Sequence, residues 1–167
     1  MIELAAALAV LVASHLVPSR DGVRGRLIGA LGRGPFLAAY SLVSVLALAA
    51  VIAAYRNADP TLLLWSPAFE TRYLAVAVMP VAVILVVCRL TQRPSAEPRG
   101  IYRITTTPGS LAVLLWSLVH LLNVGALRTV LLFLGMAAIG LGALLRNARR
   151  ADPPGIRGVV PFARILA

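Results

Sequence analysis

Apolar residues follow one another along this chain in five blocks, most of them separated by stretches rich in Arg, Pro or Gly. The second block, at residues 36–55, is long enough to cross a hydrocarbon core of about 30 Å at about 1.5 Å per residue. We therefore predict an all-α protein, a polytopic membrane helix bundle of about five transmembrane helices that forms one domain over residues 1–167. The expected helices cover residues 2–17, 36–55, 73–90, 109–124 and 126–145.

The composition also indicates an integral membrane protein. Hydrophobic residues make up 60% of the chain and charged residues 13%, whereas a soluble domain is about half apolar and about a quarter charged. The net charge of +10 comes from sixteen arginines and six acidic residues. Because the arginines flank the apolar blocks and form no basic stripe, we expect a lipid bilayer as the partner and no nucleic acid.

The arginines alternate from one inter-helix segment to the next. Thirteen lie in the first loop, the third loop and the tail at residues 146–167, and three lie in the second and fourth loops. Positively charged loops remain in the cytoplasm. The sequence therefore predicts an N-terminus outside, a C-terminus in the cytoplasm and a cytoplasmic tail.

Small residues recur in the first and fifth expected helices. Ala5, Ala9 and Ala13 follow a small-xxx-small pattern, which lets membrane helices approach closely, while His15 lies on another face. The fifth helix is small on one side, where it carries Gly135, Ala138, Gly140 and Gly142. Both faces are expected to pack closely, and residues 18–35 are expected to form a loop.

The few residues that suggest chemistry gather in the fourth expected helix. Spacings of three and four place its polar and aromatic side chains on one helical face. These residues are Trp116, Ser117, His120 and Asn123.

The two histidines of the chain, His15 and His120, both fall in membrane segments. Ionisable residues are rare there and usually face the bundle interior. Neutral imidazoles on neighbouring helices can hold a haem, and they can equally form hydrogen bonds between helices. By helix rise, the two α carbons differ in depth by about 10 Å, so a shared haem needs a tilted or shifted helix.

Six short motifs, in this order, resemble the NnrU family of bacterial membrane proteins over almost the whole chain. They are His15-Leu-Val-Pro18-Ser19, Tyr40-Ser-Leu-Val-Ser44, Leu64-Trp65-Ser-Pro67, Arg103-Ile-Thr105 with Pro108, Leu115-Trp116-Ser-Leu-Val-His120-Leu-Leu, and Val160-Pro161-Phe162-Ala163. The family is named for its association with nitrite and nitric oxide respiration genes. It is also similar to 15-cis-zeta-carotene isomerase, a haem b protein with histidine ligands.

The resemblance implies a multi-pass protein of the bacterial inner membrane that binds haem b, with His15 and His120 as the axial ligands of the iron. Its role would be linked to nitrite and nitric oxide metabolism (denitrification) or to a haem-dependent, isomerase-like activity. Arg24 and Arg103 are the expected partners of the haem propionates. The pocket would also include Trp116, Ser117 and Asn123.

The chain departs from the family pattern at two places. Thr107 stands where the family usually has a histidine before Pro108. The family also usually continues into a further apolar segment after the Val-Pro-Phe-Ala motif, whereas this sequence ends at Ala167. The expectation is a bundle without that last helix.

Two other functions remain open from the sequence. One alternative is a degenerate methyltransferase-like protein, because the Arg-x-x-x-His-Pro stretch that the family usually has resembles the cofactor-binding segment of isoprenylcysteine carboxyl methyltransferases. This chain lacks that histidine, and its tail lacks their paired glutamates and has only Asp152. A non-enzymatic accessory subunit is the other alternative. Such a subunit would contact a respiratory enzyme, or a second copy of itself, through the Gly-rich face of the fifth helix.

Overall fold

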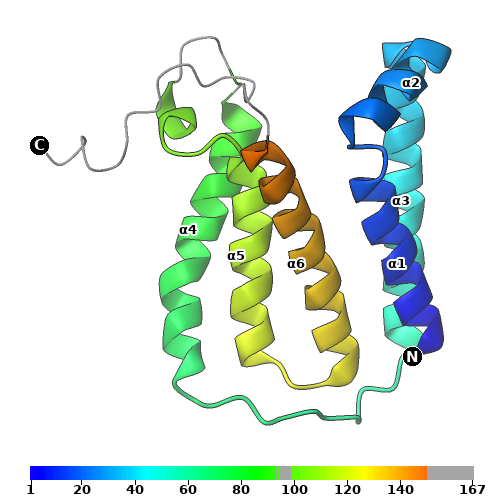
Figure 1. Cartoon of the computed structure of the whole chain (residues 1–167). Helices are drawn as coiled ribbons and strands as arrows, with labels where there is room; N and C mark the ends of the chain where they lie inside the picture. The colour runs from blue at the N-terminus through cyan, green and yellow to red at the C-terminus, as the bar shows by residue number, and fades with distance from the viewer. Residues whose placement is uncertain (93, 95–98, 150–167) are drawn as a thin grey trace, which may run out of the picture.

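The computed structural model describes residues 1–92, 94 and 99–149, and within them the chain forms helices joined by loops, with no β-strand (Figure 1). This confirms the all-α prediction. The helices are α1 (Ile2–Leu16), α2 (Asp21–Leu31), α3 (Arg33–Asn57), α4 (Thr71–Thr91), the short 3-10 helix η1 (Gly100–Arg103), α5 (Pro108–Asn123) and α6 (Leu127–Ala148). The five expected helices correspond to α1, α3, α4, α5 and α6, each within three residues at either end.

Three of these helices, α3, α4 and α6, are long and apolar enough to cross a membrane. A fourth crossing is possible if α1 and α2, which are bent by 80° relative to each other, count as one broken span. At 16 residues, α5 is apolar but shorter than the others. The described chain is therefore a multi-pass membrane protein with three to four candidate spans by length.

Residues 18–35 do not form the expected loop, because they contain α2. The pattern is ambiguous here, since arginines and glycines interrupt a short apolar series. Asp21 lies in the first turn of α2, where a negative side chain stabilises the helix dipole. None of its residues is buried, and α2 packs against α3, with the Arg24 guanidinium 5.3 Å from the Phe36 ring centroid.

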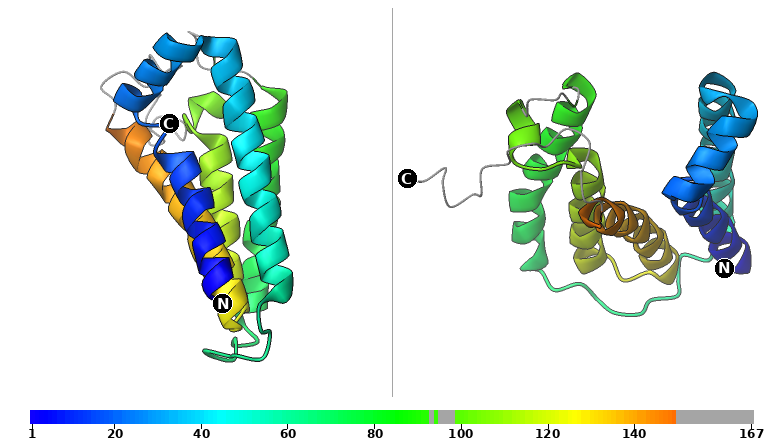
Figure 2. Two further views of the ribbon diagram at one scale, coloured as in Figure 1. Left: turned by 90° about the vertical axis from the view of Figure 1, so that its right-hand side faces the viewer. Right: turned by 45° about the horizontal axis from the view of Figure 1, so that its top comes forward.

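Helix α6 lies in the middle of the bundle. It packs against α5 on one side and against α1 on the other, while α4 covers α5 and α3 covers α1. The right-hand view of Figure 2 shows this order: α4 and α5 lie on one side of α6, and α1 and α3 on the other. The two predicted ligand helices, α1 and α5, are thus separated by α6.

The buried face of α1 is formed by leucines. Leu4, Leu8 and Leu11 are at most 5% exposed and pack against Ala47 and Val51 of α3. The small-xxx-small face points outward instead, since all three of its alanines are exposed, at positions 5, 9 and 13. This corrects the expectation that Ala5, Ala9 and Ala13 are packed closely in the bundle. Within one chain, larger side chains on α1 fill the space against the small residues of α3 and α6.

The glycines of α6 make the close contacts that were expected, but with helices of the same chain. A side chain at Gly135 would meet Leu8 of α1, and one at Gly142 would meet Leu16. At Gly140, an added Cβ would lie 3.0 Å from the main-chain nitrogen of Leu114 in α5. These three glycines are therefore in contact with α1 and α5 of the same chain, whereas Ala138 is exposed. The contact of this face with a second copy or a respiratory enzyme stays a prediction.

At the end of the bundle opposite η1, the α3–α4 loop pairs with the turn between α5 and α6. The main-chain N–H of Leu64 donates to the Gly125 carbonyl at 2.8 Å, and that of Leu127 donates to the Leu62 carbonyl at 2.8 Å. A side chain at Gly125 would collide with the Trp65 carbonyl, so the close approach of these two loops requires glycine at this position. Trp65 is 41% exposed, as expected for an aromatic anchor at a membrane interface.

The same loop contains a carboxylate that is stabilised locally. The hydroxyl of Thr61 donates to Asp59 Oδ1 at 2.6 Å, and its main-chain N–H donates to the same atom at 2.8 Å. These hydrogen bonds to the charged form hold the pKa of Asp59 below its usual value. The turn that leads out of α3 is therefore fixed by side chain to backbone bonding.

Candidate functional site

His120 lies near the end of α5 in an aromatic cluster. Its ring stacks on Phe133 of α6, with centroids 4.5 Å apart, and the Trp116 ring is 5.1 Å away. His120 Nδ1 lies 2.7 Å from the Trp116 carbonyl oxygen, one turn earlier in the same helix. Because a carbonyl only accepts hydrogen bonds, Nδ1 must carry the proton, which leaves Nε2 as the free acceptor nitrogen.

His15 shows the same arrangement in the last turn of α1. Its Nδ1 lies 2.9 Å from the Leu11 carbonyl oxygen, so this nitrogen donates and Nε2 keeps its lone pair. The edge of the imidazole meets Tyr40 of α3, with ring centroids 6.0 Å apart. Both histidines are half-buried. In each ring, Nδ1 is therefore the nitrogen that faces a main-chain carbonyl, and Nε2 is the nitrogen that makes no such contact.

The two histidines do not share one site in this arrangement. Helices α1 and α5 run in opposite directions (Figure 1), and His15 is one residue from the end of α1 while His120 is three residues from the end of α5. Helix rise then separates them in depth by about 15 Å, and α6 lies between their helices. Their assignment as the two ligands of one haem stays a prediction that the packing of these helices does not favour.

The predicted face of α5 divides between two neighbouring helices. Trp116 and His120 contact Phe133 of α6, whereas Asn123 reaches α4. There its Nδ2 donates to the Thr71 carbonyl at 3.2 Å. The same nitrogen also donates to the Val119 carbonyl at 2.9 Å, one turn earlier in α5. Asn123 thus links helix ends and does not line a pocket with His120. The reason is that α5 lies between α4 and α6, so positions on one broad face meet different helices.

Ser117 is fully buried, and its hydroxyl donates to the Val113 carbonyl at 2.7 Å. Bonding to the preceding turn is the usual role of serine in a membrane helix. This hydrogen bond uses the donor of Ser117 and supports a structural role.

The predicted propionate partners lie at the end of the bundle where α1 ends and α5 begins. Arg24 belongs to α2, and Arg103 ends η1; both side chains are exposed. Figure 1 shows α2 and η1 at the same end of the molecule, far from the end of α5 that carries His120. The arginines are therefore at the depth of His15 and not at that of His120.

A comparison with protein-family models identifies the family of the chain. The model described as NnrU protein matches residues 3–162. The chain belongs to the NnrU family. Comparisons of this NnrU protein with curated proteins and with solved structures gave no match.

One feature of the two histidines of this NnrU protein is common among metal-ligating histidines. Such histidines usually donate one ring N–H to a carbonyl or carboxylate and bind the metal through the other nitrogen; at His15 and His120 the Nδ1 atom lies against a main-chain carbonyl. The described residues contain no group of three or more His, Cys, Asp or Glu side chains that could hold a metal ion directly. A haem needs only one or two axial ligands, so that observation does not bear on it.

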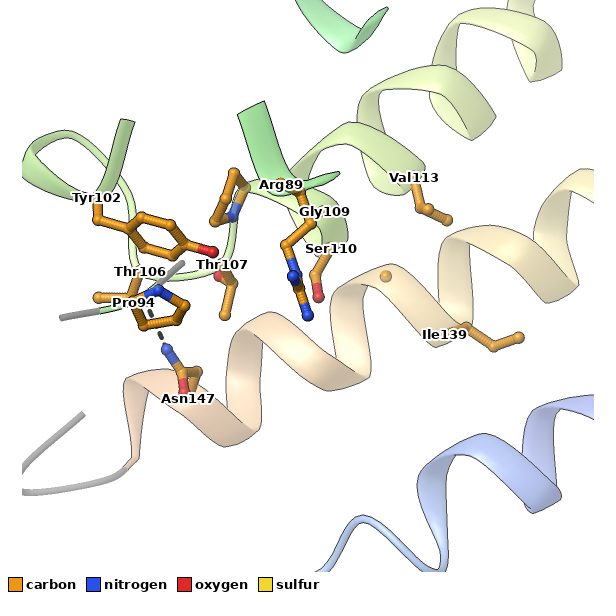
Figure 3. A pocket seen from close by; sticks show the side chains of 12 residues that line it. Arg89, Pro94, Tyr102, Thr106, Thr107, Gly109, Ser110, Val113, Ile139 and Asn147 are labelled. Carbon is orange, nitrogen blue, oxygen red and sulfur yellow. Dashed lines mark hydrogen bonds between the residues drawn. The ribbon is translucent and has the colours of Figure 1, made fainter. Parts of the chain in front are cut away.

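The position that departs from the family pattern lies at a cavity. Thr107 precedes α5 and lines a cavity of about 450 Å³ between η1, the start of α5 and α6 (Figure 3). Arg89 and Tyr102 also line this cavity, and no sequence motif predicts either of them as a site residue. Tyr102 lies next to the Arg103-Ile-Thr105 motif but is not part of it, so only the position of η1 beside the start of α5 reveals its role. The terminal Val160–Ala163 motif lies outside the described residues.

Proposed function

We propose that this NnrU protein is a haem b protein of the bacterial inner membrane whose iron ligands are the Nε2 atoms of His15 and His120. The supporting observation is the fixed tautomer of both imidazoles, each with Nδ1 donating to a main-chain carbonyl. Because the two rings lie about 15 Å apart in depth, the arrangement supports ligation at two separate positions. A haem at His15 has Arg24 and Arg103 at its own end of the bundle for its propionates.

The orientation is part of the same proposal. Five spans, with the N-terminus outside and the C-terminus in the cytoplasm, place thirteen of the sixteen arginines on the cytoplasmic side. Helices α1 and α5, of 15 and 16 residues, are about 23 Å long by helix rise. Both helices are shorter than the hydrocarbon core is thick. They would span the membrane where the bilayer is locally thinner and neighbouring helices surround them.

The family resemblance extends the proposal to a role linked to nitrite and nitric oxide metabolism, or to a haem-dependent isomerisation. No described residue is assigned a catalytic step. The alternative is an accessory subunit of a respiratory enzyme, for which co-purification of that enzyme with colourless protein would be the evidence.

The test is the haem content of detergent-purified protein, measured by its absorption spectrum and a pyridine haemochrome assay. His15→Asn and His120→Asn are suitable variants, because asparagine retains an N–H donor for the carbonyl but removes Nε2. Each should lose the haem of its own position, about half of the total, and the double variant should contain none. Free imidazole should restore haem to the corresponding glycine variants.

Three outcomes separate the possibilities. Colourless parent protein from haem-sufficient cells, or full haem in the double variant, would contradict haem ligation by these residues. Loss of nearly all haem in each single variant would show that α1 and α5 converge on one haem. Unchanged haem with a lowered unfolding temperature would show that the histidines only stabilise the helices.

A further inference from the structure

The cavity at the start of α5 contains a buried hydroxyl group without a partner. Tyr102 is 2% exposed, and its phenolic oxygen has no hydrogen-bond partner in the described part of the chain. Figure 3 shows this hydroxyl pointing into the space between η1, the start of α5 and α6. Burying a hydroxyl without a hydrogen bond costs free energy, so a ligand that accepts a hydrogen bond there would offset a cost already present in the free protein.

The N-terminus of α5 supplies further donors at the same cavity. Thr107 is the N-cap residue but makes no side-chain capping hydrogen bond, and Pro108 occupies the first turn. The first helical hydrogen bond is donated by Leu111 to the Thr107 carbonyl at 3.0 Å. The N–H groups of Gly109 and Ser110, which line the cavity, come before that bond and have no acceptor within the helix. The positive end of the helix dipole also favours an anion here.

Arg89 brings a full positive charge to these donors. Its side chain crosses Gly109 so closely that an added Cβ there would lie 3.1 Å from Arg89 Cγ. The guanidinium points into the cavity beside Ser110 (Figure 3). None of the described residues that line the cavity is acidic. The cavity therefore favours a negatively charged group and offers no partner to a cationic one.

The wall of the cavity is held by a contact between α6 and the segment before α5. Asn147 Nδ2 donates to Thr106 Oγ1 at 2.6 Å. This bond ties the end of α6 to the residues that lead into α5. The donors thus lie on a framework built from η1, α4, α5 and α6.

An apolar groove begins beside the cavity. It has a volume of about 290 Å³, lies between α4 and α5, and is lined by Met79, Ala82, Val83, Val86, Ala112 and Trp116 among others. Val113 lines both the groove and the cavity. An anionic group and an apolar chain therefore have adjoining places on the same side of α5.

We propose that this protein binds an anionic phospholipid here, with its phosphate in the cavity of Tyr102, Arg89 and the α5 N-terminus and an acyl chain in the α4–α5 groove. The phosphate accepts hydrogen bonds from the Tyr102 hydroxyl, the guanidinium and the free N–H groups. A lipid with a choline headgroup is disfavoured, since its cation has no acidic partner among the described lining residues. The cavity lies at the arginine-rich end of the bundle, where lipid phosphates lie in a bilayer.

Trp116 allows the groove itself to be observed. The chain has two tryptophans, so a Trp65→Phe background leaves Trp116 as the only one. Phosphatidic acid and phosphatidylcholine with identical brominated acyl chains are titrated into the purified protein, and quenching of Trp116 fluorescence is measured. Phosphatidic acid should quench with an apparent Kd about tenfold below that of phosphatidylcholine, because a charge-assisted hydrogen bond has roughly that effect.

Matched variants connect this preference to the cavity. Tyr102→Phe removes only the hydroxyl, and Arg89→Gln removes only the charge; each should lower the preference for phosphatidic acid by about fivefold or more. Arg26→Gln removes an exposed arginine of α2 that does not line the cavity, and it should leave the preference within about twofold. Circular dichroism checks that each variant is folded.

Two results would overturn the proposal. Equal quenching by both lipids would mean that the groove binds acyl chains and that the cavity does not bind the phosphate. A preference for phosphatidic acid that remains in both Tyr102→Phe and Arg89→Gln would mean the same. Glycerol 3-phosphate is the second arm of the experiment, because it has the phosphate without the chains. It should not compete at equal concentration, and full competition would show a site for a soluble phosphate instead of a lipid.

Discussion

Asn123, at the end of α5, and Thr71, at the start of α4, hold each other by hydrogen bonds in both directions. Asn123 Nδ2 donates to the Thr71 carbonyl at 3.2 Å. The single proton of the Thr71 hydroxyl is shared between Asn123 Oδ1 at 3.0 Å and the Ala68 carbonyl at 2.7 Å. The two residues are 52 positions apart in the chain. A polar residue that the sequence placed in a haem pocket thus joins two helices at one end of the bundle.

Asn123→Leu should lower the free energy of unfolding by about 1 kcal/mol, because hydrogen bonds between membrane helices have about this strength. Thr71→Val removes the other side-chain partner of the same pair. Thermal unfolding in detergent, followed by circular dichroism, would measure both variants and the double variant. We expect a smaller loss in the double variant than the sum of the single losses. Strict additivity would argue that the two residues act independently.

Gly140→Ala should separate α6 from α5. The new Cβ would lie 3.0 Å from both the Leu114 nitrogen and the Ser110 carbonyl oxygen, and main-chain atoms cannot move aside as a flexible side chain can. We expect a destabilisation of about 1–3 kcal/mol from overpacking. Gly29→Ala in α2 is the control, since nothing lies within 4 Å of its added Cβ, and it should be neutral or stabilise by up to about 1 kcal/mol. Similar unfolding temperatures for both variants would contradict the close α5–α6 contact.

The two faces of α1 should respond in opposite ways to substitution. Leu8 is 5% exposed and packs beneath Gly135, so Leu8→Ala should destabilise by about 2 kcal/mol through the cavity that it leaves. Ala9 is exposed, so Ala9→Leu should change the unfolding temperature little. A large loss in Ala9→Leu together with a change in oligomeric mass would show that the alanine face packs against a second copy.

Reporter fusions test the proposed orientation. A reporter placed after Ala148 should be active only in a form that works in the cytoplasm, and one inserted after Asp59 should be active only in a periplasmic form. The reason is that thirteen arginines lie in the first loop, the third loop and the tail, whereas the second loop, which contains Asp59, and the fourth loop have three. Periplasmic activity of the fusion after Ala148 would reverse the orientation.

The sequence alone determined the helical segments and the family. Apolar blocks far longer than a strand can form only helices in a membrane, so α1, α3, α4, α5 and α6 were predicted with small errors at their ends. Helix α2 was missed, because arginines and glycines interrupt its apolar positions. It is also much shorter than a membrane-spanning helix, so the length of an apolar block could not predict it. The tautomer of each histidine was also beyond sequence reasoning, although the bond to the carbonyl four residues earlier is local.

Only the tertiary structure decided which residues meet. Small residues at positions 5, 9 and 13 of α1 and at positions 135, 140 and 142 of α6 both predict close packing, yet the first set is exposed and the second is packed. The helix order α4–α5–α6–α1–α3 makes this difference, and it also keeps His15 and His120 on opposite sides of α6. Periodicity assigns residues to the faces of one helix, whereas the neighbour of each face depends on packing between segments distant in the chain. For the same reason, the buried Tyr102 hydroxyl beside Arg89 and the start of α5 became visible only in the folded chain.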